Sequence, residues 1–380
     1  MGYTFLLVSA QYLPTSGGVE RYTYNLGRRL MQDGHRIYIL TSALPGLPEH
    51  ELEDGMEIYR FPSVPFMSGR LPLLKPCPAF FRLARTLWAQ KIDYCLINTY
   101  FYPLSMYAAH CTKKRHIPTI LVNHGSAWLM TGSKPLVLAG QLYEQIAARL
   151  CHHYVPAFYG VSQAAAQWLT HFSIQAKGTV TNAICPEDVQ KTVSGKNWRQ
   201  TLHLPAEAPI IAFVGRMIPE KGVLPLLDAI SEIRADHPAA QLVMAGSGPL
   251  YTQFQQSPPE GVTLLGSQAY PDVLALLTQA DVFCLPSRSE GFACTVLEAA
   301  ALGCPILTTP TGDSPQLLPD ASYGILLKDQ SPQAIAQACI YALSNPDWCK
   351  TASERTLRRL EENYTWENST AQLYQAFDLS

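Results

Sequence analysis

The feature that most constrains the fold is a plan that occurs twice along the chain: an apolar run, a glycine-containing loop and a helical pattern. The first half opens with "YTFLLVSAQYLPTSGGVE" and the second with "APIIAFVGRMIPEKGV". Short continuous apolar runs that alternate with helical patterns are typical of parallel strands covered by helices on both faces. The sequence therefore predicts an α/β protein with two doubly wound, Rossmann-like domains.

Further segments continue the alternation in both halves. We expect strands at "RIYILTS", "DYCLINT", "PTILVNHG" and "VPAFYGVS", and in the second half at "AQLVMAG", "VTLLG", "DVFCLPS" and "PILTT". We expect helices at "ERYTYNLGRRLMQDGH", "LPLLDAISEIRADHP", "YPDVLALLTQA" and "CTVLEAAALG". Residues 183–207 are polar, irregular and dotted with proline. We therefore predict a first domain over residues 1–185, a linker over 186–206, a second domain over 207–360 and a C-terminal helix over 361–380.

Composition narrows the class of protein. The chain is 47% hydrophobic, without an uncharged apolar run of membrane-spanning length, and its first residues lack a signal peptide's basic region. Its ten cysteines form no C-x-x-C pair, which favours reduced thiols in a cytoplasmic protein over a zinc or redox site. Residues 1–195 hold 17 Lys and Arg against 11 Asp and Glu, whereas residues 196–380 hold 11 against 19. The basic first half indicates an anionic partner or surface.

Ligands of doubly wound domains bind at the carboxyl ends of the strands, so the cleft between two such domains is the expected site. Gly17 and Gly18 follow the first strand, where backbone amides can approach a phosphate; a tight strand-to-helix turn is the alternative. Arg216 and Lys221 follow the first strand of the second half and suit a diphosphate; surface charge is the alternative. Gly246 follows the next strand and allows close approach of a ligand or of backbone.

The segment "SRSEGFACTVLEAAALGCPIL" places two carboxylates, Glu290 and Glu298, around a run of small neutral residues. A helix beginning near Cys294 would offer its first amides to an anion, and the two carboxylates would accept hydrogen bonds from sugar or ribose hydroxyls. The alternative is a charge favourable to the helix dipole and one paired helix glutamate. The amides concerned belong to Phe292, Ala293, Cys294 and Thr295.

His124 in "LVNHGSAW" also lies at the carboxyl end of a predicted strand, and Asn182 in "TVTNAI" is a weaker candidate. The sequence contains no D-x-D and no H-E-x-x-H, so we expect no metal and no other cofactor. Charge on a leaving diphosphate would then be neutralised by Arg216, Lys221 and helix amides.

These residues lie in motifs that resemble the retaining glycosyltransferases of family 4, which have the GT-B fold of two domains facing each other across a cleft. The resemblance runs through nearly the whole chain, from "SGGVERYTYNLGRRLMQDGH" and "YGVSQAAAQWL" to "VGRMIPEKGV", "VMAGSGPL", "ADVFCLPSRSEGFACTVLEAAALGCPI" and "YTWENSTAQLYQAF". Its most specific parts are G-R-x-x-x-x-K-G and the Glu, seven residues, Glu arrangement. Ala183 stands where the family usually has the glycine of Asn-Gly-Val/Ile.

The resemblance implies a role for each candidate. Gly17 and Gly18 would lie against the donor diphosphate and the reacting sugar, and the final helix would return to the first domain. Arg216 and Lys221 would neutralise the diphosphate, and the loop near Ser267 would bind the base. Glu290 would hold hydroxyls of the donor sugar, Glu298 those of the ribose, and His124 would contact the sugar near the reacting centre.

We therefore predict transfer of a sugar, with retention, from a UDP- or GDP-sugar to a hydroxyl of a glycan or lipid-linked acceptor. Cell-surface polysaccharide or glycolipid synthesis is the expected setting, and nucleic acid is not an expected partner. The basic and apolar segment "FMSGRLPLLKPCPAFFRLARTLWAQK" favours peripheral contact with an anionic membrane surface, or a solvated helix face. A non-catalytic sugar-nucleotide or glycan-binding module, a phosphorylase and a dinucleotide-dependent oxidoreductase are the rivals, and the last lacks its fingerprint glycines.

Overall fold

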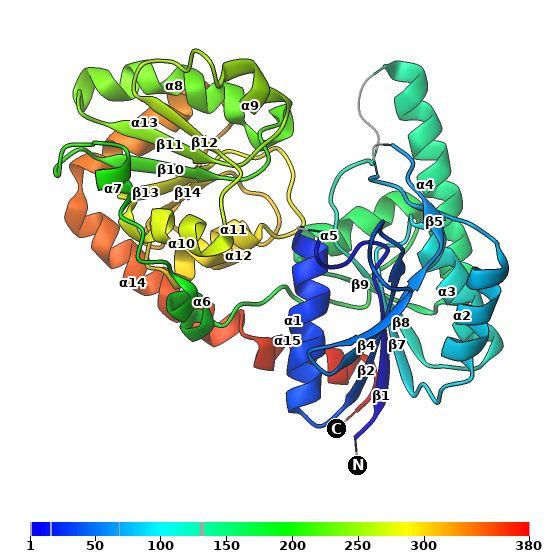
Figure 1. Ribbon diagram of the computed structural model, residues 1–380. Coiled ribbons are helices and arrows are strands. Elements are labelled where there is room, and N and C mark those ends of the chain that lie inside the picture. Colours follow the sequence, from blue (N-terminus) through cyan, green and yellow to red (C-terminus); the bar gives the residue numbers. More distant parts are fainter. Residues whose placement is uncertain (1, 16, 68, 130–132, 380) are drawn as a thin grey trace. The chain divides into compact units, whose positions relative to one another are not determined.

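The computed structural model describes residues 2–15, 17–67, 69–129 and 133–379, and the chain divides into two compact units (Figure 1). Unit 1 contains residues 1–182 and 366–380, and unit 2 contains residues 183–365. The chain therefore passes between the units twice, once after Asn182 and once after Thr365.

Unit 1 is built on a seven-stranded sheet in the order β3-β4-β2-β1-β7-β8-β9. All neighbouring strands are parallel except β3, which forms an antiparallel hairpin with β4. Its strands are β1 (Thr4–Val8), β2 (Arg36–Ser42), β3 (His50–Glu53), β4 (Met56–Phe61), β7 (Tyr94–Asn98), β8 (Thr119–Asn123) and β9 (Ala157–Gly160). The short strands β5 (Ser63–Val64) and β6 (Leu73–Leu74) pair separately.

Helices surround the unit 1 sheet, and several have proline at their first or second position, since its fixed φ and missing N–H suit the first helical turn (Figure 1). They are α1 (Gly18–Gln32), α2 (Pro78–Trp88), α3 (Pro103–Lys114), α4 (Lys134–Tyr154), α5 (Gln163–Trp168), the 3₁₀ helix η1 (Leu169–Phe172) and α15 (Trp366–Ala376). Helix α15 lies beside α1: Glu367 pairs with Arg29, and the ring of Trp366 packs on Tyr22. The last helix of the chain thus completes unit 1.

Unit 2 has a six-stranded, wholly parallel sheet in the order β12-β11-β10-β13-β14-β15. Its strands are β10 (Ile210–Val214), β11 (Gln241–Ala245), β12 (Val262–Gly266), β13 (Val282–Leu285), β14 (Ile306–Thr308) and β15 (Ile325–Leu326). Every residue of β10 and β13 is buried, as expected for central strands with helices on both faces. The strand order is the one found in dinucleotide-binding folds, with the reversal between β10 and β13.

The helices of unit 2 follow its strands (Figure 1). They are α6 (Pro186–Thr192), α7 (Trp198–Thr201), η2 (Pro219–Lys221), α8 (Val223–Asp236), α9 (Pro249–Phe254), α10 (Tyr270–Gln279), α11 (Cys294–Ala301), α12 (Ser314–Leu317), α13 (Pro332–Ser344) and α14 (Pro346–Asn363). Two doubly wound units with parallel central strands confirm the predicted fold class.

Residues 186–206, which we expected to form a linker, instead belong to unit 2. Helices α6 and α7 lie in this segment, and the side chains of Val189 and Trp198 are buried in the unit 2 core. The indole Nε1 of Trp198 also donates a hydrogen bond to the carbonyl oxygen of Asp272. The polar surroundings of these two hydrophobic anchors made the segment resemble a linker. Among the helices that the structure describes, none is both long and apolar enough to cross a membrane.

Candidate active site

Three loops at the carboxyl edge of the unit 2 sheet are joined by backbone hydrogen bonds. The amide of Met217, after β10, donates to the carbonyl of Ser247, after β11, at 2.8 Å. The amide of Arg288, after β13, donates to the carbonyl of Glu220 at the same distance. These bonds give the candidate residues on the three loops a fixed backbone.

Glycines allow these loops to approach so closely. Gly246 has a φ of +140°, and a Cβ on it would lie 1.8 Å from the carbonyl oxygen of Gly215. Gly222 has a φ of +72°, and a Cβ there would lie 2.1 Å from the carbonyl oxygen of Pro286. Loop packing thus accounts for both glycines without a ligand, so the donor-binding role of Gly246 stays a prediction.

Lys221, at the end of η2, and Glu290, in the loop after β13, form an ion pair at this edge. The Nζ atom of Lys221 lies 2.5 Å from Oε1 of Glu290, and both side chains are largely buried. Arg216 lies between β10 and η2 and is exposed, with no side-chain hydrogen bond or ion pair to the rest of the described chain. The structure therefore brings together Lys221 and Glu290, which the sequence placed 69 positions apart.

Helix α11 begins at Cys294, as the sequence predicted, and Ala293 is its N-cap. Ala293 has no side chain that could accept a hydrogen bond from the first helical amides, which include Thr295. Phe292 anchors the preceding turn, because its ring is buried and meets the edge of Tyr364 at 5.2 Å between centroids. Glu298 lies one turn into the helix and is 3% exposed.

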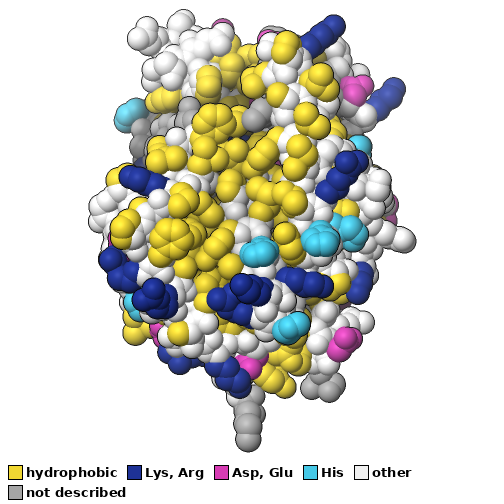
Figure 2. Space-filling model, turned by 90° about the vertical axis from the view of Figure 1, so that its right-hand side faces the viewer, with side chains coloured by type: hydrophobic (Ala, Val, Ile, Leu, Met, Phe, Trp, Pro, Cys, Tyr) yellow, Lys and Arg dark blue, Asp and Glu magenta, His cyan; other side chains and the backbone are white. Residues whose placement is uncertain are grey.

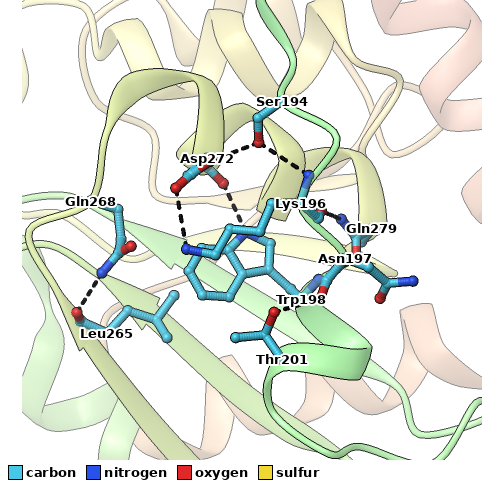
Figure 3. Close-up of polar contacts among 9 residues, drawn as sticks. All are labelled: Ser194, Lys196, Asn197, Trp198, Thr201, Leu265, Gln268, Asp272 and Gln279. Carbon is cyan, nitrogen blue, oxygen red and sulfur yellow. Dashed lines mark hydrogen bonds and ion pairs between the residues drawn. The ribbon is translucent and has the colours of Figure 1, made fainter.

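The loop between β12 and α10 carries Ser267, which is exposed. Figure 3 shows how this region is held: the side-chain Nε2 of Gln268 donates to the backbone carbonyl of Leu265, while the carboxylate of Asp272 accepts from the Ser194 hydroxyl and pairs with the Lys196 ammonium at 2.7 and 3.1 Å. The ammonium of Lys196 also lies 3.9 Å from the ring centre of Trp198. Asp272 therefore has its charge balanced within unit 2 and anchors residues 194–198 to α10.

In unit 1, Gly17 and Gly18 lie at the start of α1, as predicted, with Gly17 as the N-cap. The buried carboxylate of Glu20 packs on Gly17, and a Cβ there would lie 2.2 Å from its Oε2 atom. A carboxylate near a helix N-terminus is favourable to the helix dipole. Glu20 thus supplies a structural reason for Gly17, and the contact of either glycine with a diphosphate stays a prediction.

His124 follows β8 and forms one end of a hydrogen-bond chain that runs through the buried side chains of Asn98 and Thr23. Its Nε2 atom lies 2.7 Å from Oδ1 of Asn98, Nδ2 of Asn98 donates to Oγ1 of Thr23 at 3.1 Å, and this hydroxyl donates to the carbonyl of Val19 at 2.7 Å. The ring also meets the edge of Tyr22 at 4.8 Å. The chain links β8, β7 and α1.

The chain of bonds defines the tautomer of His124. Because the Thr23 hydroxyl donates to a carbonyl, it accepts from Asn98, whose oxygen then accepts from Nε2 of the histidine. Burial lowers the pKa of His124 to about 3, so the ring is neutral near pH 7. Its Nδ1 atom therefore carries a lone pair, which can accept a hydrogen bond from a hydroxyl.

Sequence reasoning missed Asn98 and Thr23. Asn98 ends the apolar run "YCLIN", so a polar residue at a strand's carboxyl end was the available signal. Thr23 lies inside a helix and gives no such signal. Asn182, a weaker candidate, is buried at the last position of unit 1's first segment. Among the described residues, no three His, Cys, Asp or Glu side chains are grouped closely enough to hold a metal ion.

Comparison with known proteins agrees with this architecture. Residues 16–182 match the family model described as Glycosyltransferase Family 4, and residues 194–359 match that described as Glycosyl transferases group 1. The chain therefore belongs to the family 4 glycosyltransferases, and its fold is the GT-B fold.

Individual relatives have low sequence identity to this chain, but the matches extend over most of its length. The uncharacterized glycosyltransferase MJ1069 of Methanocaldococcus jannaschii is 21% identical, over 98% of this chain and 97% of its own. The putative teichuronic acid biosynthesis glycosyltransferase TuaC of Bacillus subtilis is 28% identical, over 77% of this chain and 72% of its own. The structure of Anabaena HepE with UDP and glucose has a TM-score of 0.74 at 17% identity, covering 99% of both chains.

Proposed function

We propose that this glycosyltransferase moves a sugar from a nucleotide diphosphate sugar to a hydroxyl of a glycan or lipid-linked acceptor, with retention at the anomeric carbon. The buried pair of Lys221 and Glu290 carries the proposal, because it presents a cation and a hydroxyl-binding carboxylate at the carboxyl edge of a doubly wound sheet. The solved complex of HepE with UDP-glucose supports a nucleotide-sugar donor for a protein of this fold. TuaC supports polysaccharide synthesis as the setting.

In this proposal, Arg216 and Lys221 neutralise the diphosphate, together with the first amides of α11. Lys221 exchanges part of its interaction with Glu290 for a phosphate oxygen, and Glu290 then accepts hydrogen bonds from sugar hydroxyls. Glu298 holds the ribose, and the backbone near Ser267 holds the base. His124, as a neutral acceptor at Nδ1, binds a hydroxyl of the donor sugar.

For the chemical step we propose a front-face substitution. The bond between the anomeric carbon and the diphosphate oxygen breaks, the acceptor oxygen bonds to the same face, and the acceptor proton passes to the departing phosphate oxygen. The protein orients the reactants and stabilises the developing charge on the diphosphate. This scheme needs no metal and no protein nucleophile, and both features are parts of the proposal.

The test is a screen of UDP-, GDP- and ADP-sugars for slow hydrolysis without acceptor, with NAD as the control ligand in a thermal-shift assay. One nucleotide sugar should be hydrolysed, with the sugar first released as the donor's anomer, and its nucleotide diphosphate should raise the melting temperature. Thermal protection without hydrolysis or transfer of any sugar would instead support the non-catalytic binding module.

A further inference from the structure

Helix α4 of unit 1 has hydrophobic residues on the side that faces solvent. Leu138, Leu142, Ile146 and Leu150 are spaced four residues apart, which places them along one side of the helix. The buried residues of α4 lie on the opposite side and are mostly small: Gly140, Glu144, Ala147, Ala148 and Cys151. The usual arrangement of a surface helix, with large apolar residues inside and polar residues outside, is therefore reversed.

The exposure of these side chains is large enough to demand an explanation. Leu138 is 67% exposed and Leu142 is 62% exposed, and Leu136, Ile146 and Leu150 are also exposed. Phe66 and Phe81 add exposed rings elsewhere in unit 1. Figure 2 shows hydrophobic side chains gathered over the face formed by α2, α3 and α4, with Lys, Arg and His around them. A continuous patch of this kind marks an interaction site rather than scattered surface residues.

The charge of the region identifies the partner. Residues 58–186 contain 12 Lys and Arg but only two acidic residues, Asp93 and Glu144. Glu144 is fully buried, where its oxygens accept hydrogen bonds from the amide of Leu129 and the hydroxyl of Tyr100. Asp93 is paired with Lys91 and the amide of Thr4. The exposed charges of α4 are therefore all basic and are supplied by Lys134 and Arg149.

We propose that this outward face of α4, with the basic residues around it, binds the surface of an anionic lipid bilayer. The hydrophobic row can enter the boundary between headgroups and acyl chains while Lys134, Arg149 and the C-terminal Lys113 and Lys114 of α3 contact anionic headgroups. A symmetric dimer through the same face would set these basic groups against identical ones, which disfavours a second copy as the partner.

Membrane binding goes beyond the proposed function and does not depend on it, since binding requires neither donor nor acceptor. Its consequence for that function is positional: unit 1 would lie at a bilayer, within reach of an acceptor anchored there. The inference thus favours a lipid-linked acceptor over a soluble glycan.

The experiment is cosedimentation of the full chain with phosphatidylcholine vesicles, with or without about 30% phosphatidylglycerol. We expect binding only to the anionic vesicles, and weaker binding at about 500 mM than at about 50 mM NaCl. Leu138→Gln combined with Leu142→Gln should weaken binding by at least roughly tenfold, because two exposed leucines no longer enter the bilayer. Lys134→Gln with Arg149→Gln should reduce both the affinity and its salt dependence.

Matched controls come from unit 2. Leu224→Gln removes another exposed helical leucine, and Lys328→Gln with Lys350→Gln removes the same charge, so neither should change vesicle binding. Unchanged melting temperatures would show that every variant is folded. Equal binding of the α4 variants and the controls would overturn the proposal. A lipid-independent dimer that the α4 leucine variant abolishes would also overturn it and identify the face as a protein interface.

Discussion

The Nε2 atom of His124 lies 2.7 Å from Oδ1 of Asn98, and this contact decides which nitrogen of the imidazole carries the proton. Because the next member of the chain, Thr23, donates onward to a carbonyl, the direction of every bond is defined. Asn98 and Thr23 contact no substrate in our proposal. They nevertheless determine that His124 presents a hydrogen-bond acceptor, its Nδ1 atom, to the donor sugar. Asn98 and Thr23 are positioning residues in this sense.

Replacing Asn98 with aspartate should change the protonation of His124 while leaving the fold intact. Asn98→Asp sets a carboxylate beside Nε2, which favours the imidazolium and should raise the histidine pKa above the wild-type value of about 3. Nitrogen-15 NMR of selectively labelled histidine should show the neutral Nε2–H tautomer in the wild type at pH 7, and a titrating ring in the variant. If both proteins show the same tautomer and pKa, Asn98 does not control the ring.

The burial of His124 should also appear in the pH dependence of stability. Its folded-state pKa of about 3 lies below the ordinary value of 6.5, so between these values the unfolded chain binds more protons. Its contribution to stability is fully present above pH 6.5 and is lost as the pH falls, and the loss amounts to about 2 kcal/mol at pH 5. Burial raises the pKa of Glu144, which acts in the opposite direction but equally in wild type and variant.

Urea unfolding at pH 7 and pH 5 isolates this contribution when the wild type is compared with His124→Gln. We expect the free energy of unfolding to fall more between the two pH values in the wild type than in the variant. An identical fall in both proteins would show that His124 can take up a proton in the folded state.

Two glycines of unit 2 have nearly the same backbone conformation but different surroundings. Gly222 has a φ of +72° and faces the carbonyl of Pro286, whereas Gly303 has a φ of +67° and a Cβ on it would meet no atom within 4 Å. Gly303→Ala should cost about 1–2 kcal/mol, from backbone conformation alone. Gly222→Ala should cost at least about 2 kcal/mol more, and the displacement of Lys221 should lower turnover. Equal stability of the two variants in urea unfolding would contradict the packing described for this edge.

Alanine at Arg216 or Lys221 should lower turnover by about 10²–10³-fold, as for the loss of a donor that stabilises a developing anion. Lys328→Ala, which removes an exposed lysine of the same unit, is the matched control and should leave turnover unchanged. Initial rates at saturating donor sugar measure the effect. Wild-type turnover in either variant would remove that residue from the proposed mechanism.

The sequence predicted the sheets well because buried parallel strands are continuous apolar runs. Both central strands, "FLLV" and "IIAFV", and the helix start at Cys294 are where the patterns placed them. The hairpin of β3 and β4 was not predicted, because "HELE" is polar and its residues are mostly exposed. Residues 186–206 were misplaced because their few core residues are scattered among polar ones.

Candidate site residues that directly follow a strand could be predicted from the sequence, whereas those elsewhere could not. Lys221, Glu290 and His124 all follow strands, so each could be found from the pattern alone. The contact between Lys221 and Glu290 depends on the strand order, in which β13 pairs with β10, and a single sequence does not supply that order. The outward leucines of α4 were missed for another reason: a four-residue spacing of apolar residues normally indicates a buried face.

The return of α15 to unit 1 makes unit 2 an insertion within the first unit, and this has a consequence for synthesis on the ribosome. Residues 183–365 can fold as soon as they emerge, whereas α15, the partner of α1, is translated only after them. One side of α1 therefore stays uncovered in the nascent first unit until residues 366–376 have been synthesised.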